Sequence, residues 1–427
     1  MAVLVAAPGA QAAEKAIWGP VTLPGGGSAF PTYTDLGVDT FQYTVSFADV
    51  APTRPAAANN PSDPAYRWPA ELDQAVAEAA ASRINVALLV TQSPGWANGG
   101  RSALHAPDPA AFADFMAAAS RRYPSVLRWM IWGEPNRADR FLPNAENSPE
   151  GPRAYARILD AAYGALKAVS PRNIVIGGMT WTGGDVKPAP FMEFMRLPNG
   201  HPPRLDWFGH NPFPFRFPNL RELAVAGGFR DISDLDVFQR QLRRTYGKRA
   251  RFWLSEFLVL SDRGSDQFRM SVSRVDQARW LRAAYRIADD LDSVAGLGWL
   301  SLLDERERAG SSNWGLLTAG GERKPSYAAY RTAPSERFRP AVRAPKRLRR
   351  AGLARGRLRV QVRVSLAGRT TVQLNRGTRR VARVRRSVGA SSTATIRLRV
   401  RRPSRGRYRL IVRAPRAPTI RRSVTVR

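Results

Sequence analysis

Two glutamates in this chain of 427 residues each follow an apolar run. Glu134 lies within residues 132–136, Trp-Gly-Glu-Pro-Asn, which continue the apolar run 127–131. Glu256 follows residues 252–255, Phe-Trp-Leu-Ser. Carboxylates delivered by two buried strands to one edge of a sheet can act together, one as a proton donor and the other as a nucleophile. Such a pair is the minimal equipment for hydrolysing a glycosidic bond.

The two carboxyls could also tune each other. A nearby ionised Glu256 is expected to raise the pKa of Glu134 and to keep it protonated as an acid. The alternative is that each glutamate belongs to a structural ion pair. The candidate partners are Arg137 and Arg140 for Glu134, and Arg251 and Arg263 for Glu256.

Apolar, β-rich segments recur along the first part of the chain. From the second segment onward their ends lie 43 to 46 residues apart, with one shorter gap of 32. The runs are apolar on both faces, as expected for parallel strands covered by helices. Eight strands alternating with helices predict an α/β protein with a (β/α)₈ TIM barrel, whose active face is formed by the C-terminal strand ends. The predicted strands are 17–21, 40–47, 84–90, 127–133, 173–179, 205–211, 252–257 and 297–303.

Helix start signals lie between these strands. Asp108, followed by a proline, predicts an N-cap for a helix over 110–122. Ser233 with Asp236 resembles a capping box, and Ser273 with Asp276 repeats that pattern before a helix that reaches about residue 291.

The pattern changes after about residue 335. Prolines punctuate a Pro/Arg linker over 336–346, and short alternating runs follow over 347–427. Period-2 alternation with turns near 375–377 and 403–406 predicts antiparallel strands and a small all-β, immunoglobulin-like sandwich. The barrel is therefore expected to span 14–335.

The positive charge is concentrated in this C-terminal module. Of 67 Lys and Arg residues, 30 lie in 337–427, which contains no Asp or Glu. The first 336 residues hold the remaining 37 against 34 acidic residues and are close to neutral. Three interpretations stay open: a solvated strand face, docking on an anionic envelope polymer or acidic glycan, and nucleic-acid binding. The last is disfavoured, because aromatic residues that would stack on bases are almost absent.

The N-terminal residues 1–13 form a short apolar stretch with an Ala-Gln-Ala pattern at 10–12, which is expected of a remnant of a secretion signal. An ordinary alanine-rich terminus is the alternative. An extracellular or cell-surface location follows from the first interpretation. No apolar run is long enough to predict a membrane span.

Metal and thiol chemistry are disfavoured by composition. The chain has no cysteine and only three histidines, which show no i,i+4 spacing. We therefore predict no metal site and no cofactor.

Several aromatic and polar residues near the predicted strand ends could contact a sugar. Tryptophans can stack on the apolar side of a pyranose ring, although core packing is an equally common role. The candidate substrate-binding residues are Trp96, Trp132, Asn136, His210, Asn211 and Trp299.

The motif at 132–136, together with Leu-Ser-Glu-Phe at 254–257, resembles glycoside hydrolase clan A, and most of all barrels of the family 39 and family 5 type. Residues 91–97, 210–212 and 324–330 are similar to further parts of such barrels, and the resemblance extends over roughly 15–335. It implies a retaining O-glycoside hydrolase acting on a poly- or oligosaccharide. By that likeness Glu134 is the acid/base and Glu256 the nucleophile.

Two departures from the clan pattern favour an alternative. Clan members usually carry Asn before the acid/base, where it contacts the sugar 2-hydroxyl; here that residue is Gly133, which Asn136 or Asn211 would have to replace. Many also place a Tyr after the sixth strand, where this chain offers Phe213 and Phe215. The alternative is a non-catalytic carbohydrate-binding barrel tethered to an anionic cell-envelope polymer, and a third interpretation is a polyanion-binding surface protein.

Overall fold

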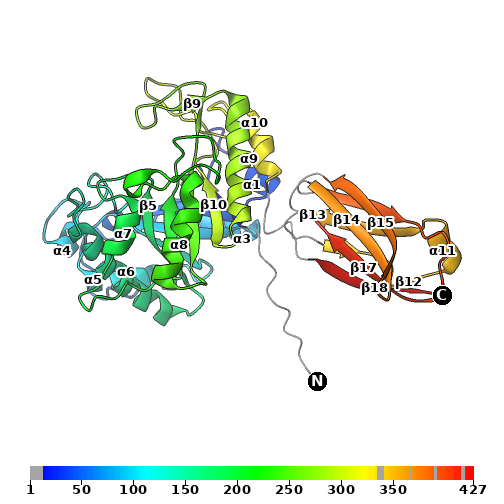
Figure 1. Ribbon diagram of the computed structural model, residues 1–427. Helices are drawn as coiled ribbons and strands as arrows, with labels where there is room; N and C mark the ends of the chain where they lie inside the picture. The colour runs from blue at the N-terminus through cyan, green and yellow to red at the C-terminus, as the bar shows by residue number, and fades with distance from the viewer. Residues whose placement is uncertain (1–12, 334–340, 365–367, 389–391, 415–418) are drawn as a thin grey trace. The chain divides into compact units, whose positions relative to one another are not determined.

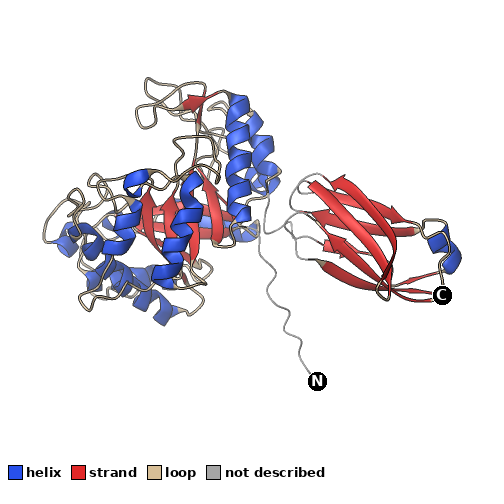
Figure 2. Cartoon of the chain, in the orientation of Figure 1, coloured by secondary structure: helices blue, strands red, loops and turns tan. Residues whose placement is uncertain are grey.

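The computed structural model describes residues 13–333, 341–364, 368–388, 392–414 and 419–427 (Figure 1). The chain divides into two compact units, a larger one over Glu14–Arg331 and a smaller one that begins at Thr332. The larger unit mixes helices and strands, whereas the smaller one is almost entirely strands (Figure 2).

The larger unit is a closed barrel of eight parallel strands in the order β1-β10-β7-β6-β5-β4-β3-β2. Each strand pairs with its neighbour in parallel, and the last strand pairs with the first. This is the (β/α)₈ barrel predicted from the apolar runs. The strands are β1 (Glu14–Trp18), β2 (Thr40–Ser46), β3 (Asn85–Thr91), β4 (Arg128–Ile131), β5 (Ile174–Trp181), β6 (Trp207–Asn211), β7 (Arg251–Phe257) and β10 (Val294–Trp299).

Helices surround the barrel and start where the sequence places caps. The Asp108 side chain accepts bonds from the amides of Ala110 and Ala111, and the Ser273 hydroxyl accepts one from Asp276. The capping box near 233 is instead formed by Asp231 and Asp234, which open a 3₁₀ turn before α8. The helices of this unit are α1 (Phe30–Leu36), α2 (Phe47–Val50), α3 (Ala70–Ala81), α4 (Gly95–Asn98), α5 (Pro109–Arg122), α6 (Glu150–Val169), α7 (Pro188–Phe194), η1 (Ala226–Gly228), η2 (Ile232–Asp234), α8 (Leu235–Tyr246), α9 (Arg274–Asp290) and α10 (Pro325–Arg331).

The first and last barrel strands lie about three residues earlier than predicted. Strand β1 begins with Glu14 and Lys15, which are both buried. The prediction missed them because charged residues interrupt an apolar pattern, yet each has a partner inside the fold. Glu14 accepts bonds from Arg128 at 2.5 Å and from the Thr40 hydroxyl at 2.6 Å.

Lys15, the second residue of β1, has a buried side chain. Its Nζ donates to the Leu36 carbonyl at 2.6 Å and lies 4.6 Å from the centre of the Tyr330 ring. Burial lowers its pKa from 10.5 to about 7, although the charge of Asp39 opposes the shift. The neutral amine is therefore favoured by the folded state.

Replacing Lys15 by methionine should remove one pH dependence of stability. Between pH 7 and 10.5 the unfolded chain holds the Lys15 proton more tightly than the native one, so native stability rises with pH in that window. The contribution of this group is about 1.4 kcal/mol per pH unit. Urea unfolding of wild type and Lys15→Met at pH 7, 8 and 9 measures it: the wild type should gain stability relative to the variant, and parallel curves would contradict the prediction.

The smaller unit is a β-sandwich of two sheets, ordered β11-β13-β16 and β12-β18-β17-β14-β15. Most neighbouring strands pair antiparallel, as the alternating runs predict, and β12 pairs with β18 in parallel. Its elements are β11 (Ala341–Arg343), β12 (Arg347–Leu348), α11 (Arg350–Ala354), β13 (Leu358–Val364), β14 (Gly368–Arg376), β15 (Arg379–Val388), β16 (Ser392–Leu398), β17 (Gly406–Arg413) and β18 (Ile420–Val426).

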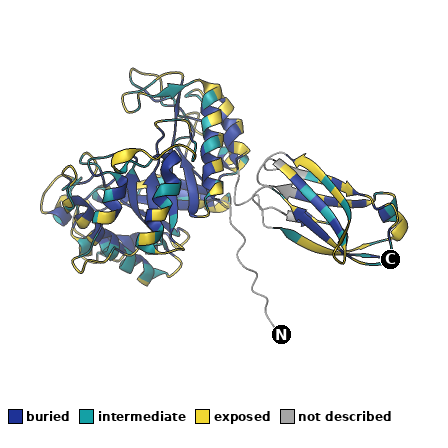
Figure 3. Cartoon of the chain, viewed as in Figure 1, coloured by how far each residue is buried: buried dark blue, intermediate teal, exposed yellow. Residues whose placement is uncertain are grey.

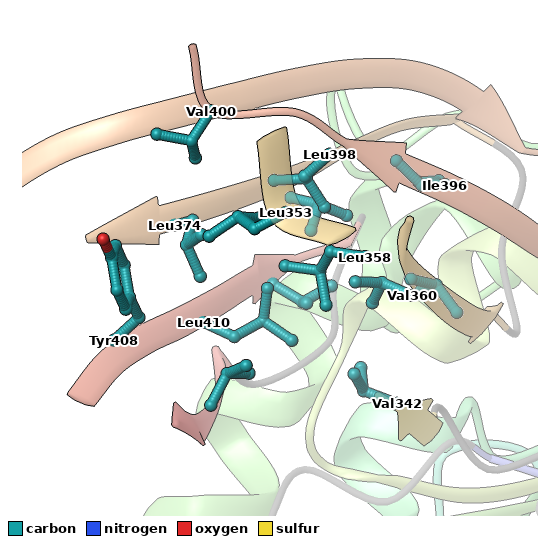
Figure 4. Close-up of a cluster of buried hydrophobic side chains, with 14 of the residues drawn as sticks. Val342, Leu353, Leu358, Val360, Leu374, Ile396, Leu398, Val400, Tyr408 and Leu410 are labelled. Atoms are coloured by element: carbon teal, nitrogen blue, oxygen red, sulfur yellow. The ribbon is translucent and has the colours of Figure 1, made fainter. Parts of the chain in front are cut away.

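The inner faces of both sheets supply one apolar core. Leu358, Val360 and Ile396 come from the three-stranded sheet and meet Leu374 and Leu410 of the five-stranded sheet (Figure 4). Most outward residues of the same strands are exposed or partly exposed (Figure 3).

The predicted linker over 336–346 contains β11, whose Val342 pairs with Val362 and lies in the sandwich core. The prediction missed this strand because three residues between prolines are too few to show an alternating pattern.

Two further expectations concern membranes and targeting. Across the described ranges, no helix combines the length and apolar character needed to cross a bilayer. Nearly all of the predicted signal remnant, 1–13, lies outside the described residues, so the secreted location stays a prediction.

Candidate active site

Glu134 lies on a tight turn that directly follows β4. Trp132 and Glu134 have φ angles of 61° and 49°, a left-handed conformation that non-glycine residues adopt only when the surrounding structure holds them there. The Glu134 amide donates to the Met179 carbonyl of β5 at 3.0 Å. The neighbouring strand therefore fixes the turn that positions this carboxyl.

Both oxygens of the Glu134 carboxyl are hydrogen-bonded. Arg137 Nη1 donates to Oε2 at 2.7 Å, and Asn211 Nδ2, from the end of β6, donates to Oε1 at 3.1 Å. Arg137 is itself held by two bonds to Asp139, at 3.0 and 2.7 Å, and its guanidinium lies 4.9 Å from the centre of the Trp181 ring. Of the two structural partners considered for Glu134, Arg137 is the one that the fold provides.

Glu256 is the penultimate residue of β7, and the carbonyl before it accepts hydrogen bonds from side chains of β1 and β2. Trp18 Nε1 donates to the Ser255 oxygen at 3.0 Å, and Gln42 Nε2 donates to it at 2.8 Å. Gly298 makes room for this arrangement, because a Cβ there would lie 2.0 Å from the Ser255 oxygen. Neither structural partner considered for Glu256 is used: Arg251 donates to the Val294 carbonyl and Arg263 pairs with Glu307.

The two carboxyls lie close enough to influence each other. The Asn211 amide, which donates to Glu134, also lowers the pKa of Glu256, so one side chain influences both carboxyls. Although Glu256 is partly exposed as a residue, burial of its carboxyl and, to a smaller extent, the charge of Glu134 together raise its pKa to about 8. The sequence pattern predicted a raised pKa at Glu134. In the structure the raised pKa belongs to Glu256 instead.

His210 and Asn136 were both expected to contact substrate, but their side chains are buried and bond to the protein backbone. His210 is fully buried and its ring nitrogens contact the Thr180 and Arg230 carbonyls at 2.9 and 2.8 Å; burial lowers its pKa to about 4. Asn136 is also fully buried, and its amide bonds the backbone of Trp181, Gly183 and Val186. Both predictions took a polar side chain near a strand end for an exposed one.

The three candidate tryptophans differ in exposure. Trp132 and Trp299 are completely buried, with their indole nitrogens bonded to the Arg140 and Trp314 carbonyls, so they present no surface to a sugar ring. This corrects the prediction of Trp299 as a stacking platform. Trp96 is only partly buried and remains a candidate, with its indole nitrogen bonded to the Ala51 carbonyl.

The roles of several other residues of the site were not predicted from the sequence. Trp18 and Gln42 orient the end of β7 from β1 and β2, and no pattern in the sequence signals a contact across more than two hundred residues. Arg137 and the partly exposed Trp181 form a stacked pair beside Glu134. For Arg137 a signal existed, since its position three residues after Glu134 allows a contact within one turn.

Within the part of the chain that the structure describes, no cluster of three or more His, Asp or Glu side chains could hold a metal ion. The polar groups that the structure brings together at Glu134 and Glu256 are two carboxyls, one amide and one guanidinium.

Comparison with known proteins identifies the fold. No protein-family model matches the chain, and no curated protein matches it in sequence. Among solved structures, a family 39 glycoside hydrolase from the gut symbiont Bacteroides cellulosilyticus WH2 is similar, with 14% identity, coverage of 91% of this chain and 80% of the other, and a TM-score of 0.58. The family 39 enzyme from Xanthomonas axonopodis pv. citri aligns with 16% identity over 90% and 91% of the two chains, with a TM-score of 0.53.

A monomeric β-xylosidase from Caulobacter crescentus CB15 is likewise similar, with 15% identity, coverage of 94% and 95%, and a TM-score of 0.53. At these identities the likeness concerns the fold. The chain thus has the architecture of these glycosidases, a closed (β/α)₈ barrel followed by an all-β unit.

Proposed function

We propose that the chain is a retaining O-glycoside hydrolase that uses Glu134 and Glu256. The observation that carries the proposal is the placement of the two carboxyls around Asn211: its amide donates to Glu134, and it also influences Glu256, whose pKa responds to the charge of Glu134. Two acceptors that each lie about 3 Å from one amide nitrogen are less than about 6 Å apart. That separation matches direct attack by a carboxylate, whereas an inverting enzyme needs room for a water molecule between its carboxyls, at about 6.5–9.5 Å.

In this mechanism Glu256 attacks the anomeric carbon while Glu134 protonates the departing glycosidic oxygen. A covalent glycosyl-enzyme forms, and Glu134 then removes a proton from the water that releases it. Because the resting site favours the proton on Glu256, substrate binding has to transfer it to Glu134 before bond cleavage. Arg137 stabilises Glu134 in its second role, as the ionised base.

Asn211 supplies the contact that Gly133 lacks. Its Oδ1 atom is buried and has no hydrogen-bond partner within the described part of the chain. A buried acceptor of this kind favours a donor from a bound ligand. A sugar hydroxyl next to the anomeric carbon is the donor that a site between the two carboxyls would offer.

The proposed substrate is a poly- or oligosaccharide, as the resemblance to family 39 and to the β-xylosidase named above supports. The test is release of reducing sugar from a panel of neutral and acidic polysaccharides by wild type and by Glu256→Gln. Release by wild type alone supports the proposal. Equal release by both proteins would remove Glu256 from the chemistry, and no release by either would favour the second candidate function below.

The pH dependence of kcat/KM should show a falling limb near pH 8. The reaction needs one proton on the carboxyl pair, and the pKa of about 8 at Glu256 marks the loss of that last proton. Above this value no acid remains to protonate the leaving group, so kcat/KM falls about tenfold per pH unit. A pH–rate profile from pH 5 to 10 measures the limb.

The control for this limb is Glu134→Gln, in which no acid can be lost and the falling limb should disappear. A stability measurement checks the same pKa without activity. Between pH 4.5 and about 8 the folded state holds the Glu256 proton more tightly, so wild-type stability should fall with rising pH and Glu256→Gln should not follow. Parallel stability curves would contradict the raised pKa.

A second candidate function is carbohydrate binding without turnover, which Gly133 favours. A Cβ at this position would lie 3.3 Å from a Leu89 methyl group, a side-chain contact that can adjust, and its backbone needs no left-handed conformation. Gly133→Asn restores the usual clan residue and should raise kcat/KM about tenfold, because hydrogen bonds to the 2-hydroxyl strengthen in the transition state. Gly133→Ala, which adds the Cβ without the amide, should not. Absence of turnover in all three proteins would support the binding function.

We also propose that the basic module of 347–427 holds the barrel on an anionic polymer of the cell envelope, outside the cell. Thirty basic residues and no acidic ones in 337–427 support this, since such a charge attracts any polyanion. Charge alone does not say which surface binds or which polyanion fits.

A further inference from the structure

The outer side of the five-stranded sheet is rich in exposed arginines. Along β17, Leu410 and Val412 point into the core, whereas Arg409 and Arg413 alternate with them and are exposed. The same alternation holds for the neighbouring strands. We call the exposed arginines of this outer side the arginine face: Arg369, Arg380, Arg383, Arg385, Arg407, Arg409, Arg413 and Arg421.

The strand register places six of these arginines in two bands, one on β15 and one on β17, whereas Arg369 lies on β14 and Arg421 on β18. Thr371 of β14, the strand between the two bands, pairs with Arg385 of β15 on one side and with Arg413 of β17 on the other. Residues paired across antiparallel strands point to the same face, so both guanidinium groups flank β14. Arginines two residues apart on one strand, such as Arg383 and Arg385, are spaced by about 7 Å, and the two bands lie about 10 Å apart, which is two strand spacings.

A neutral strip separates the bands. Beyond Arg369, the outward side chains on β14 are Thr371, Gln373 and Asn375, all of them partly exposed. The Gln373 amide donates to the Asn375 side-chain oxygen at 2.7 Å. This bond does not use the Gln373 side-chain oxygen or the Asn375 amide nitrogen. Amides and hydroxyls are groups that pair with sugar hydroxyls, whereas the arginines pair with carboxylates or sulfates.

The charges of this face are not neutralised within the unit. Residues 337–427 hold no Asp or Glu that could form an ion pair. At Arg383 the effect is direct: desolvation lowers its pKa, and the charges of Arg385 and Arg413 lower it further. An external anion would relieve this repulsion.

The face fits some polyanions better than others. Its described side chains include no aromatic residue on which bases could stack, and Tyr408 points into the core. Five strands about 4.8 Å apart are wider than the major groove of about 12 Å. The single apolar outward residue, Ile411, is 9% exposed, so the face offers nothing to insert into a bilayer.

We propose that the arginine face binds a linear acidic polysaccharide, with the neutral strip of β14 contacting its hydroxyls and the flanking arginines contacting its anionic groups. The site is separate from the carboxyl pair of the barrel and does not depend on catalysis. It identifies the surface and the class of ligand through which the basic module would act.

The experiment measures binding of polygalacturonate to the full chain in the Glu256→Gln background, where no cleavage interferes. The test variant is Arg383→Gln/Arg385→Gln/Arg413→Gln. The matched control, Arg343→Gln/Arg359→Gln/Arg397→Gln, removes three exposed charges from the outer face of the three-stranded sheet. We expect the test variant to bind about 10- to 100-fold more weakly and to show a shallower dependence on salt, with the control within a few-fold of wild type.

Three further ligands test which class of polymer the arginine face binds. Dextran should not bind, and single-stranded DNA and vesicles containing anionic phospholipid should bind more weakly than polygalacturonate. Gln373→Ala/Asn375→Ala should lower affinity for polygalacturonate and leave affinity for DNA unchanged. Equal loss in test and control variants, or DNA or vesicle binding as tight as polygalacturonate binding, would overturn the proposal.

Discussion

Replacing Glu134 by alanine is expected to lower kcat about 10²- to 10⁴-fold on glycosides with unactivated leaving groups. Such leaving groups need a proton as the glycosidic bond breaks, and Glu134 is the carboxyl that the β4 turn directs toward Glu256 and Asn211. Aryl glycosides with acidic phenol leaving groups need no such proton, so their first step should be nearly unaffected. The kcat/KM values of matched alkyl and dinitrophenyl glycosides, which report on the first step, measure the difference.

Rescue by azide distinguishes the acid/base role of Glu134 from the nucleophile role of Glu256. In Glu134→Ala the glycosyl-enzyme still forms but no base activates water, so azide, which needs no base, should accelerate turnover and give a glycosyl azide of retained configuration. In Glu256→Ala the same anion would have to attack from the face that Glu256 occupies and would give the inverted product. Wild-type rates of Glu134→Ala on unactivated glycosides would exclude Glu134 as the acid.

Replacing Arg128 by methionine is expected to lower the free energy of unfolding of the barrel by about 3–5 kcal/mol, because a buried carboxylate then loses its charged partner. Arg128 and Glu14 lie inside the barrel at the starts of β4 and β1, with side chains 11% and 7% exposed. This end of a barrel serves stability rather than chemistry. Urea unfolding followed by tryptophan fluorescence reports on the barrel, since all 11 tryptophans precede Thr332.

The matched control is the double variant Glu14→Gln/Arg128→Met, which removes both charges. Replacing both members of a buried ion pair is far less destabilising than removing one. The double variant should therefore recover much of the loss seen in Arg128→Met. A loss in the double variant as large as the sum of both single variants would mean that the pair itself contributes nothing.

The barrel was predictable because its strands are buried on both faces. Parallel strands covered by helices need continuous apolar runs, and a run of six or seven such residues is visible in the sequence without any tertiary information. The first and last residues of each strand are harder to predict from such runs. Glu14 and Lys15 belong to β1 although they are charged, since Arg128 and the Leu36 carbonyl satisfy them from distant elements.

The meeting of Glu134 and Glu256 was predictable for a topological reason: in a parallel barrel all strands end on one face. The exposure of their neighbours was not. Trp132 follows β4 directly but has a left-handed backbone, and its ring packs against Phe112 and Phe141. Hydrophobicity alone cannot separate a tryptophan in the core from one that stacks on a sugar, because both uses bury an aromatic surface.

Local pattern and composition were enough to predict the order of the barrel strands, the change to a basic β-sandwich and the two glutamates at strand ends. Which carboxyl has the raised pKa depends instead on the tertiary structure. That outcome depends on Arg137 and Asn211 reaching Glu134 and on burial of the Glu256 carboxyl. Charge energies vary with distance and solvent exposure, and both are set by how β4, β6 and β7 meet rather than by any residue's place in the chain.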